Sequence, residues 1–150
     1  MRRIVDLEVA VNEEVDDHVT PGRITKCDQR TRQGRLATAV EFYEAAEMIE
    51  TLAESETHRI DVYISNCVLA GIAAADVICC ARLGVHSQGD DHREAVALLE
   101  QVNKTMARNL DTLLNQKTRL GYSALMSSLA SKRQAGRAAK ALVEFAQTAG

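Results

Sequence analysis

The chain has 150 residues, of which 26% are charged and 3% aromatic, and its formal net charge is −3. That length fits one domain of about 100–150 residues, large enough to fold without a disulfide or a metal. No run approaches the length of apolar sequence that a membrane span needs, and the first residues turn acidic within a few positions, unlike a secretory signal. We therefore expect one cytoplasmic domain that makes no contact with a membrane.

The net charge hides an asymmetry along the chain. Residues 1–100 contain 10 Lys and Arg against 19 Asp and Glu, whereas residues 101–150 contain 8 against 2. A basic final third can bind a polyanion such as RNA. It can equally dock against the acidic part of the same chain or of a second copy, and the sequence leaves both interpretations open.

Residues 1–26 are expected to form an N-terminal arm or a short strand. The segment IVDLEVAV alternates apolar and polar residues, as a strand does, and the turn signal TPG follows it. No partner strand is evident in the rest of the chain, so such a strand would have to pair with a copy of itself across a dimer. The domain proper is expected to be residues 27–150.

Helical periodicity begins after Asp28, a good N-cap residue, and predicts a first helix over 29–54. The second predicted helix, 58–83, is apolar nearly all round, which is typical of a helix at the centre of a bundle. Gly84 follows it, where a left-handed cap is usual.

The stretch SQGDDHREAV contains a helix start, with capping-box spacing from Ser87 to Asp90 and from Asp91 to Glu94. The helical pattern then continues to Leu125, either as one helix broken near 103–105 or as two helices. A turn at 127–131, with Ser131 as N-cap, precedes the last helix. The predicted fold is all-α, an antiparallel bundle of four to five helices.

The four cysteines are predicted to be free thiols. No CxxC pair occurs, and three of the four lie in the apolar second helix, where cysteine behaves as a small hydrophobe. A disulfide is not expected in a cytoplasmic chain. The four are Cys27, Cys67, Cys79 and Cys80.

Two segments resemble the HEPN superfamily, the nucleotide-binding helical domain of higher eukaryotes and prokaryotes. They are LAGIAAADVICCARLGVHSQGDDHREAVALL and KTRLGYSALMSSLASKRQAGRAAKALVEFA, the second with Arg119, Gly121 and Tyr122 in the family's order. The resemblance implies a compact bundle that often dimerises. It also implies activity as an RNA-cleaving toxin, partnership with a nucleotidyltransferase antitoxin, or RNA or nucleotide binding.

The sequence departs from the family's catalytic motif, an Arg followed by a His after four to six residues. The nearest arginine before His86 or His92 is Arg82, with three and nine residues between. No catalytic residue can therefore be transferred, and we expect a binding or regulatory module rather than an enzyme. The enzyme alternative is a divergent metal-independent endoribonuclease that uses Arg82, His86 and His92.

The cluster Asp90, Asp91, His92 and Glu94 offers oxygen and nitrogen atoms that could bind a metal. A di-metal bundle needs Glu-x-x-His motifs, and none occurs here. Helix capping explains the acidic residues instead, so we expect neither a metal nor a cofactor.

Asp76 is a carboxylate in an apolar helix and needs a partner, because an unpaired buried charge is costly. Arg82 does not share its helix face, so we expect the partner on another helix, with His92 or Arg93 as candidates. Asp76 would then either fix the helix register or form a wall of a polar pocket. The candidate polar site comprises Asp76, Arg82, His86, Asp91 and His92.

Basic residues of the final third form a second candidate set, which could line one end of the bundle and bind phosphates. Scarce aromatic residues argue against stacking of single strands. The set is Lys117, Arg119, Lys132, Arg133, Arg137 and Lys140. The leading hypothesis is an RNA- or nucleotide-associated module of a toxin–antitoxin or defence system, homodimeric, with RNA or an antitoxin as partner. A purely structural or protein-interaction bundle is the remaining alternative.

Overall fold

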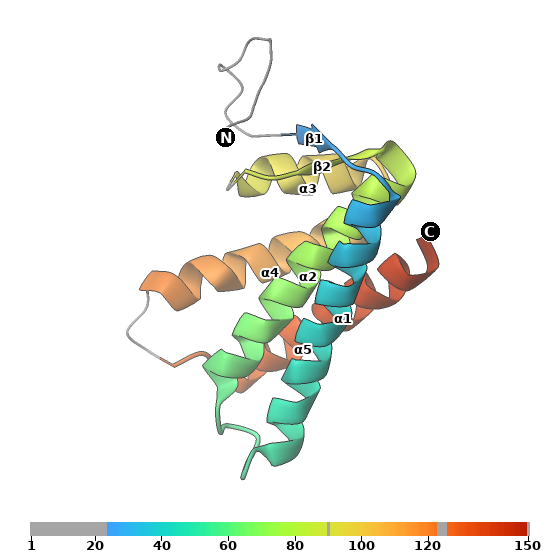
Figure 1. The fold of residues 1–150 in the computed structure, drawn as a ribbon. Helices are drawn as coiled ribbons and strands as arrows, with labels where there is room; N and C mark the ends of the chain where they lie inside the picture. The colour runs from blue at the N-terminus through green and yellow to red at the C-terminus, as the bar shows by residue number, and fades with distance from the viewer. Residues whose placement is uncertain (1–23, 90, 123–125, 150) are drawn as a thin grey trace, which may run out of the picture.

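A computed structural model describes residues 24–89, 91–122 and 126–149. Most of them are helical, which confirms the predicted all-α class, and a two-stranded antiparallel ribbon is added to it (Figure 1). The strand expected within IVDLEVAV lies outside the described residues. In chain order the elements are β1 (Ile24–Lys26), α1 (Gln29–Leu52), α2 (Ile60–Leu83), β2 (Val85–Ser87), α3 (His92–Glu100), α4 (Lys104–Tyr122) and α5 (Leu129–Ala149).

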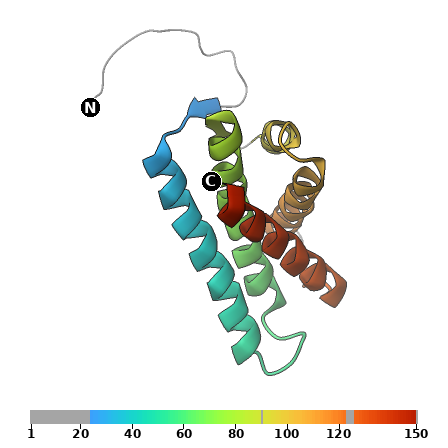
Figure 2. The same ribbon diagram turned by 90° about the vertical axis from the view of Figure 1, so that its right-hand side faces the viewer.

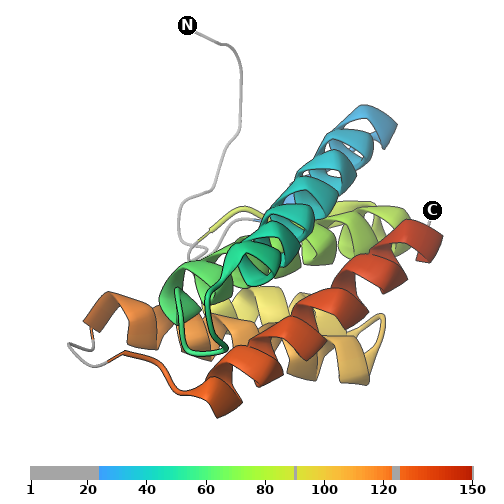
Figure 3. The same ribbon diagram turned by 90° about the horizontal axis from the view of Figure 1, so that it is seen from below.

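Helix α2 is the centre of the fold and contacts each of the other four helices. Figures 1 and 2 show α1 antiparallel to α2 on one side, α3 and α4 on the other side, and α5 crossing α2. The view from below in Figure 3 shows the same order, with α2 between α1 and α4. Because these neighbours pack against it, α2 buries most of its side chains, as its uniform apolar sequence predicts, although Val62 and Leu69 stay exposed.

By length and composition alone, α2 is also a helix that could cross a membrane, with a mean hydropathy of 1.9 over its most apolar window. The interior of the fold buries 67% of that window. The core helices of soluble proteins pass the same test, so the membrane expectation stays a prediction.

Three of the predicted helix ends are confirmed. The Asp28 carboxylate accepts a hydrogen bond from the Thr31 amide (2.8 Å) and caps α1. Asp91 accepts from two amides at the start of α3. Gly84 ends α2 with φ of 74°, a left-handed conformation that glycine adopts without steric cost.

The later helices settle one expectation and correct another. Of the two alternatives left open for the helical pattern after Asp91, the structure has two helices, α3 and α4, and Asn103 caps α4 by accepting from the Met106 amide at 2.9 Å. Helix α5 begins before Ser131, which is buried within it. The Ser131 amide instead donates to the Ser128 hydroxyl at 3.1 Å, so Ser128 takes the capping role that was predicted for Ser131.

Strands β1 and β2 were not predicted. They pair antiparallel, with Thr25 opposite His86, and the Cys27 amide extends the ladder by donating to the Gly84 carbonyl at 3.1 Å. Each strand has only three residues, too few for an alternating pattern to be recognised.

This pairing also overturns part of the cysteine prediction. Cys27 and Cys80 form a disulfide with their Cα atoms 5.8 Å apart. The thiol expectation was wrong for this pair, because a contact across 53 residues leaves no local signal. Cys67 and Cys79 are buried free thiols, as predicted, and burial raises the pKa of each to about 12.

A glycine lets the neighbouring helices approach α2 closely. A Cβ at Gly71 would lie 2.2 Å from Cδ1 of Leu113 and 3.3 Å from Cδ1 of Leu142. Both leucines are fully buried, so neither can move aside freely. A Cβ at Gly34, in contrast, would meet nothing within 4 Å.

The two helical glycines should therefore respond oppositely to alanine. Gly71→Ala is expected to lower the free energy of unfolding by about 1–3 kcal/mol through overpacking. Gly34→Ala is expected to raise it by about 0.5–1 kcal/mol, because alanine is the better helix former. Urea denaturation of both variants measures this difference, and a stabilised Gly71→Ala protein would contradict the close approach.

Candidate functional site

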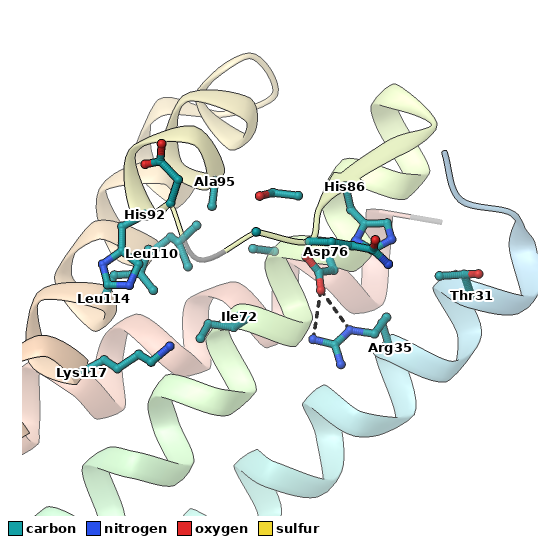
Figure 4. Close-up of a pocket in the computed structure, with 15 residues that line it drawn as sticks. Thr31, Arg35, Ile72, Asp76, His86, His92, Ala95, Leu110, Leu114 and Lys117 are labelled. Carbon is teal, nitrogen blue, oxygen red and sulfur yellow. Dashed lines mark hydrogen bonds and ion pairs between the residues drawn. The ribbon is translucent and has the colours of Figure 1, made fainter. Parts of the chain in front are cut away.

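A pocket of about 420 Å³ lies between α1, α2 and β2 on one side and α3 and α4 on the other (Figure 4). Its apolar surface comes from α2, α3 and α4, and its polar groups come from all five elements. The apolar lining residues are Ile72, Ala75, Ala95, Leu110 and Leu114.

Asp76 and Arg35 form the best-connected polar group of the pocket. Arg35 on α1 donates from Nε (3.0 Å) and approaches with Nη2 (2.9 Å) to the same oxygen, Oδ2 of Asp76. The Asp76 side chain is 14% exposed. Burial raises the pKa of its carboxyl group, and the charges of Arg35 and His86 oppose that rise.

The partner of Asp76 does lie on another helix, as predicted, but both candidates named for it were wrong. Arg93 is 95% exposed and lies near Asp91 instead, with 3.9 Å between Nε and Oδ1. His92 lines the same pocket but makes no ion pair with Asp76 among the described residues. The actual cationic partner, Arg35, is 41 residues away in sequence.

His86 lies in the centre of β2 and is 6% exposed. Its Nδ1 is 3.7 Å from Oδ1 of Asp76 and has no hydrogen-bond partner within the part of the chain that the structure describes. Asp76 thus lies between a guanidinium and an imidazole, and its two oxygens face different partners.

The opposite wall carries His92 and Lys117. Figure 4 shows them across Ile72 from the Arg35–Asp76 pair, His92 at the start of α3 and Lys117 on α4. Asp91 lines the pocket beside His92, but its carboxylate accepts hydrogen bonds from the backbone of α3 and so acts as the helix cap.

Four of the five predicted polar-site residues meet in this pocket: Asp76, His86, Asp91 and His92. Arg82 does not. It is exposed, and its guanidinium lies over the Phe145 ring at 5.5 Å from the ring centre. Arg35 was missed, because nothing local separates it from the other arginines at the start of α1.

The six predicted phosphate-binding residues do not form one free basic surface. Lys132 is 4% exposed, and its Nζ lies 2.5 Å from Oε1 of Glu50 and donates to the Glu56 carbonyl at 2.9 Å. Arg133 pairs with the Glu56 carboxylate at 2.8 Å. These contacts match the other interpretation of the charge asymmetry, docking of the basic part on the acidic part of the same chain.

The remaining four members are spread over α4 and α5. Arg119 donates to Gln116 and, at 2.7 Å, to the Ser131 hydroxyl. Arg137 and Lys140 are exposed on α5. Lys117, one of the predicted phosphate-binding residues, lines the pocket together with the residues of the predicted polar site.

The described residues contain no evident metal site, because no three of their His, Cys, Asp or Glu side chains lie close enough together to hold an ion. A scan of family models and searches of curated proteins and of solved structures gave no match. The HEPN resemblance therefore stays a prediction, and function has to be argued from the pocket.

The ion pair of the pocket gives a pH-dependent prediction. Arg35→Met should lower the free energy of unfolding by about 3 kcal/mol near pH 7, because Asp76 then stays buried without its main partner. In this variant the pKa of Asp76 is higher when folded than when unfolded. The lost stability should therefore return as the pH falls through that pKa, and be lost again as it rises.

Urea denaturation at pH 5 and pH 7 checks this. Arg30→Met, an exposed arginine one turn earlier on α1, is the control and should change little. Adding Asp76→Asn to Arg35→Met should remove most of the pH dependence. An equal loss at both pH values, unaffected by Asp76→Asn, would contradict the ion-pair assignment.

Proposed function

We propose that this chain is a binding module whose pocket takes a phosphate-bearing ligand, either a nucleotide or a segment of RNA. The observation that carries the proposal is the convergence of four basic or titratable side chains, each from a different element, on one pocket. They are Arg35 from α1, His86 from β2, His92 from α3 and Lys117 from α4.

The size and chemistry of the pocket support such a ligand. A volume of about 420 Å³ lies in the range of small-molecule sites, about 300–1,000 Å³. The apolar surface around Ile72 and Leu110 suits a base or a sugar face. Lys117 and His92 beside it supply donors for phosphate oxygens. Since Asp76 offsets the charge of Arg35, Lys117 carries most of the attraction for an anion.

The HEPN resemblance adds the biological setting to this proposal. It supports a homodimer that acts in a toxin–antitoxin or defence system, in the cytoplasm, with RNA or an antitoxin protein as partner. The ion pairs of Lys132 and Arg133 make these two residues poor candidates for an RNA contact, because both are already engaged within the chain.

Binding can be tested with the four ribonucleoside monophosphates by calorimetry and with a labelled single-stranded RNA by fluorescence anisotropy, both at low salt. Lys117→Ala should weaken binding about tenfold or more, because a hydrogen bond to a charged group contributes about 1.5–3 kcal/mol. The salt dependence of RNA binding should also become shallower, since one phosphate contact is lost.

Lys140→Ala is the matched control, because Lys140 is an exposed lysine outside the pocket. It should leave affinity unchanged. Equal losses from the two lysines would indicate diffuse surface binding. The absence of any binding at low salt would remove the proposal.

Metal-independent RNA cleavage is a second candidate function, favoured by the presence of both histidines and Lys117 in one pocket. One imidazole would take the proton of a ribose 2′-hydroxyl as its oxygen attacks phosphorus. The other would protonate the departing 5′-oxygen, leaving a 2′,3′-cyclic phosphate. Oδ1 of Asp76 lies 3.7 Å from Nδ1 of His86, an arrangement in which a carboxylate can orient a general base, so we assign His86 as the base and His92 as the acid.

Cleavage of RNA in the presence of EDTA tests this candidate. His92→Gln and His86→Gln should each lower the rate about 10²–10⁴-fold, because each removes one proton-transfer group. Arg82→Gln, outside the pocket, is the control and should not matter. Cleavage that persists unchanged in the double histidine variant would exclude the mechanism and point to a contaminating nuclease.

A further inference from the structure

The disulfide lies at the edge of the pocket wall that carries His86. Cys27 directly follows β1, and Cys80 lies in the last turn of α2. Figure 1 shows β1 beside β2, above the end of α2. The bond therefore ties the start of the described chain to the central helix at the point where β2 begins.

Little else anchors β1. Its three residues are exposed or half-buried, and Ile24 is 51% exposed. Beyond the short ladder with β2, Thr25 donates to the Gln88 side chain at 2.9 Å, an exposed contact. Exposed hydrogen bonds without apolar burial hold a segment weakly, so the covalent bond is the main tether of this strand.

The pairing of β1 with β2 reaches the pocket directly. Thr25 is opposite His86 in the register, and β2 with the residue after it supplies His86, Ser87 and Gln88 to the pocket lining. On the other side of Cys27, Asp28 caps α1, the helix that carries Arg35. A conformational change at Cys27 can therefore affect two walls of the pocket, the one formed by β2 and the one formed by α1.

We propose that Cys27–Cys80 is a redox-modified site through which thiol reduction controls the pocket. A dithiol reductant supplies two electrons. Its thiolate attacks the sulfur of Cys27, the S–S bond breaks, and the Cys80 sulfur leaves and takes up a proton. The second thiol of the reductant then displaces Cys27 and closes its own disulfide, so both protein cysteines end as thiols.

The surroundings favour attack at Cys27 and a reversible reaction. Cys27 is half-buried, whereas Cys80 is only 8% exposed. The free cysteines, Cys67 and Cys79, are buried, and burial raises the pKa of each to about 12. They stay protonated at neutral pH and do not compete for either sulfur. After reduction β1 loses its tether, β2 loses its partner, and the His86 wall loosens.

Hydrogen exchange measured by mass spectrometry on the whole chain, with and without dithiothreitol, tests the proposal. Reduction should speed exchange of the amides in residues 24–27 and 85–88 by about tenfold or more, while the buried helix α2 keeps its protection. Cys27→Ala should show fast exchange without reductant and no further change with it. Cys67→Ala, a buried cysteine away from the disulfide, should respond as the wild type does.

The same samples are then compared for binding of the labelled RNA, an arm that rests on the proposed function. Reduction should weaken RNA binding by the wild type and by Cys67→Ala. The RNA affinity of Cys27→Ala should be the same with and without reductant, because this variant has no disulfide to reduce. If neither RNA nor the ribonucleoside monophosphates bind in either redox state, the proposed function fails, while the exchange measurement still decides whether the disulfide controls β1 and β2.

Several results would overturn the redox proposal. Unchanged exchange in residues 85–88 after reduction would show that the bond does not hold the wall. Loss of protection from hydrogen exchange throughout α2 would show that the disulfide is needed for the whole fold and not for the pocket wall alone. Equal RNA affinity in both redox states would show that the disulfide does not affect binding in the pocket. Alkylation of all four cysteines in the unreduced, denatured protein would show that the disulfide does not form.

Discussion

The burial of α2 among the other four helices underlies the rest of the structure. A helix that is apolar all round gains stability as neighbours cover its faces, and here α1, α3, α4 and α5 bury most of its apolar side chains. Close approach at Gly71 lets Leu113 and Leu142 reach the helix. Any polar group on α2 must then find its partner on a neighbouring element, because water is excluded from most of its surface.

Asp76 shows how this constraint produces the pocket. Its carboxylate lies where the cover of α2 is incomplete, between α1 on one side and α3 and α4 on the other, and it is satisfied by Arg35 with His86 nearby. His92 and Lys117 line the opposite side of the same pocket. The pairing of one buried charge is a structural requirement. It occurs in the same pocket as a set of groups suited to bind a phosphate ester.

The short ribbon of β1 and β2 and the disulfide beside it close one side of that gap. Strand β2 packs on α2 and α3, and its Val85 lies against the core, whereas β1 is mostly exposed and joins the fold through β2 and the disulfide. The ribbon and the disulfide hold His86 at the pocket and fix the chain that leads into α1. A weakly buried strand thus lies directly beside the candidate site, as is common where a site has to respond to its surroundings.

Features that depend on neighbouring residues could be predicted from the sequence alone. Apolar spacing identified the helices, and Asp28, Gly84 and Asp91 marked their ends through contacts within one turn. The sequence also isolated Asp76, His86 and His92 as the residues that helix architecture does not explain. The partners of distant residues became known only from the fold: Arg35 for Asp76, Cys27 for Cys80, and Glu50 for Lys132. These contacts join residues tens of positions apart, and their geometry follows from how whole helices pack, which no local pattern records.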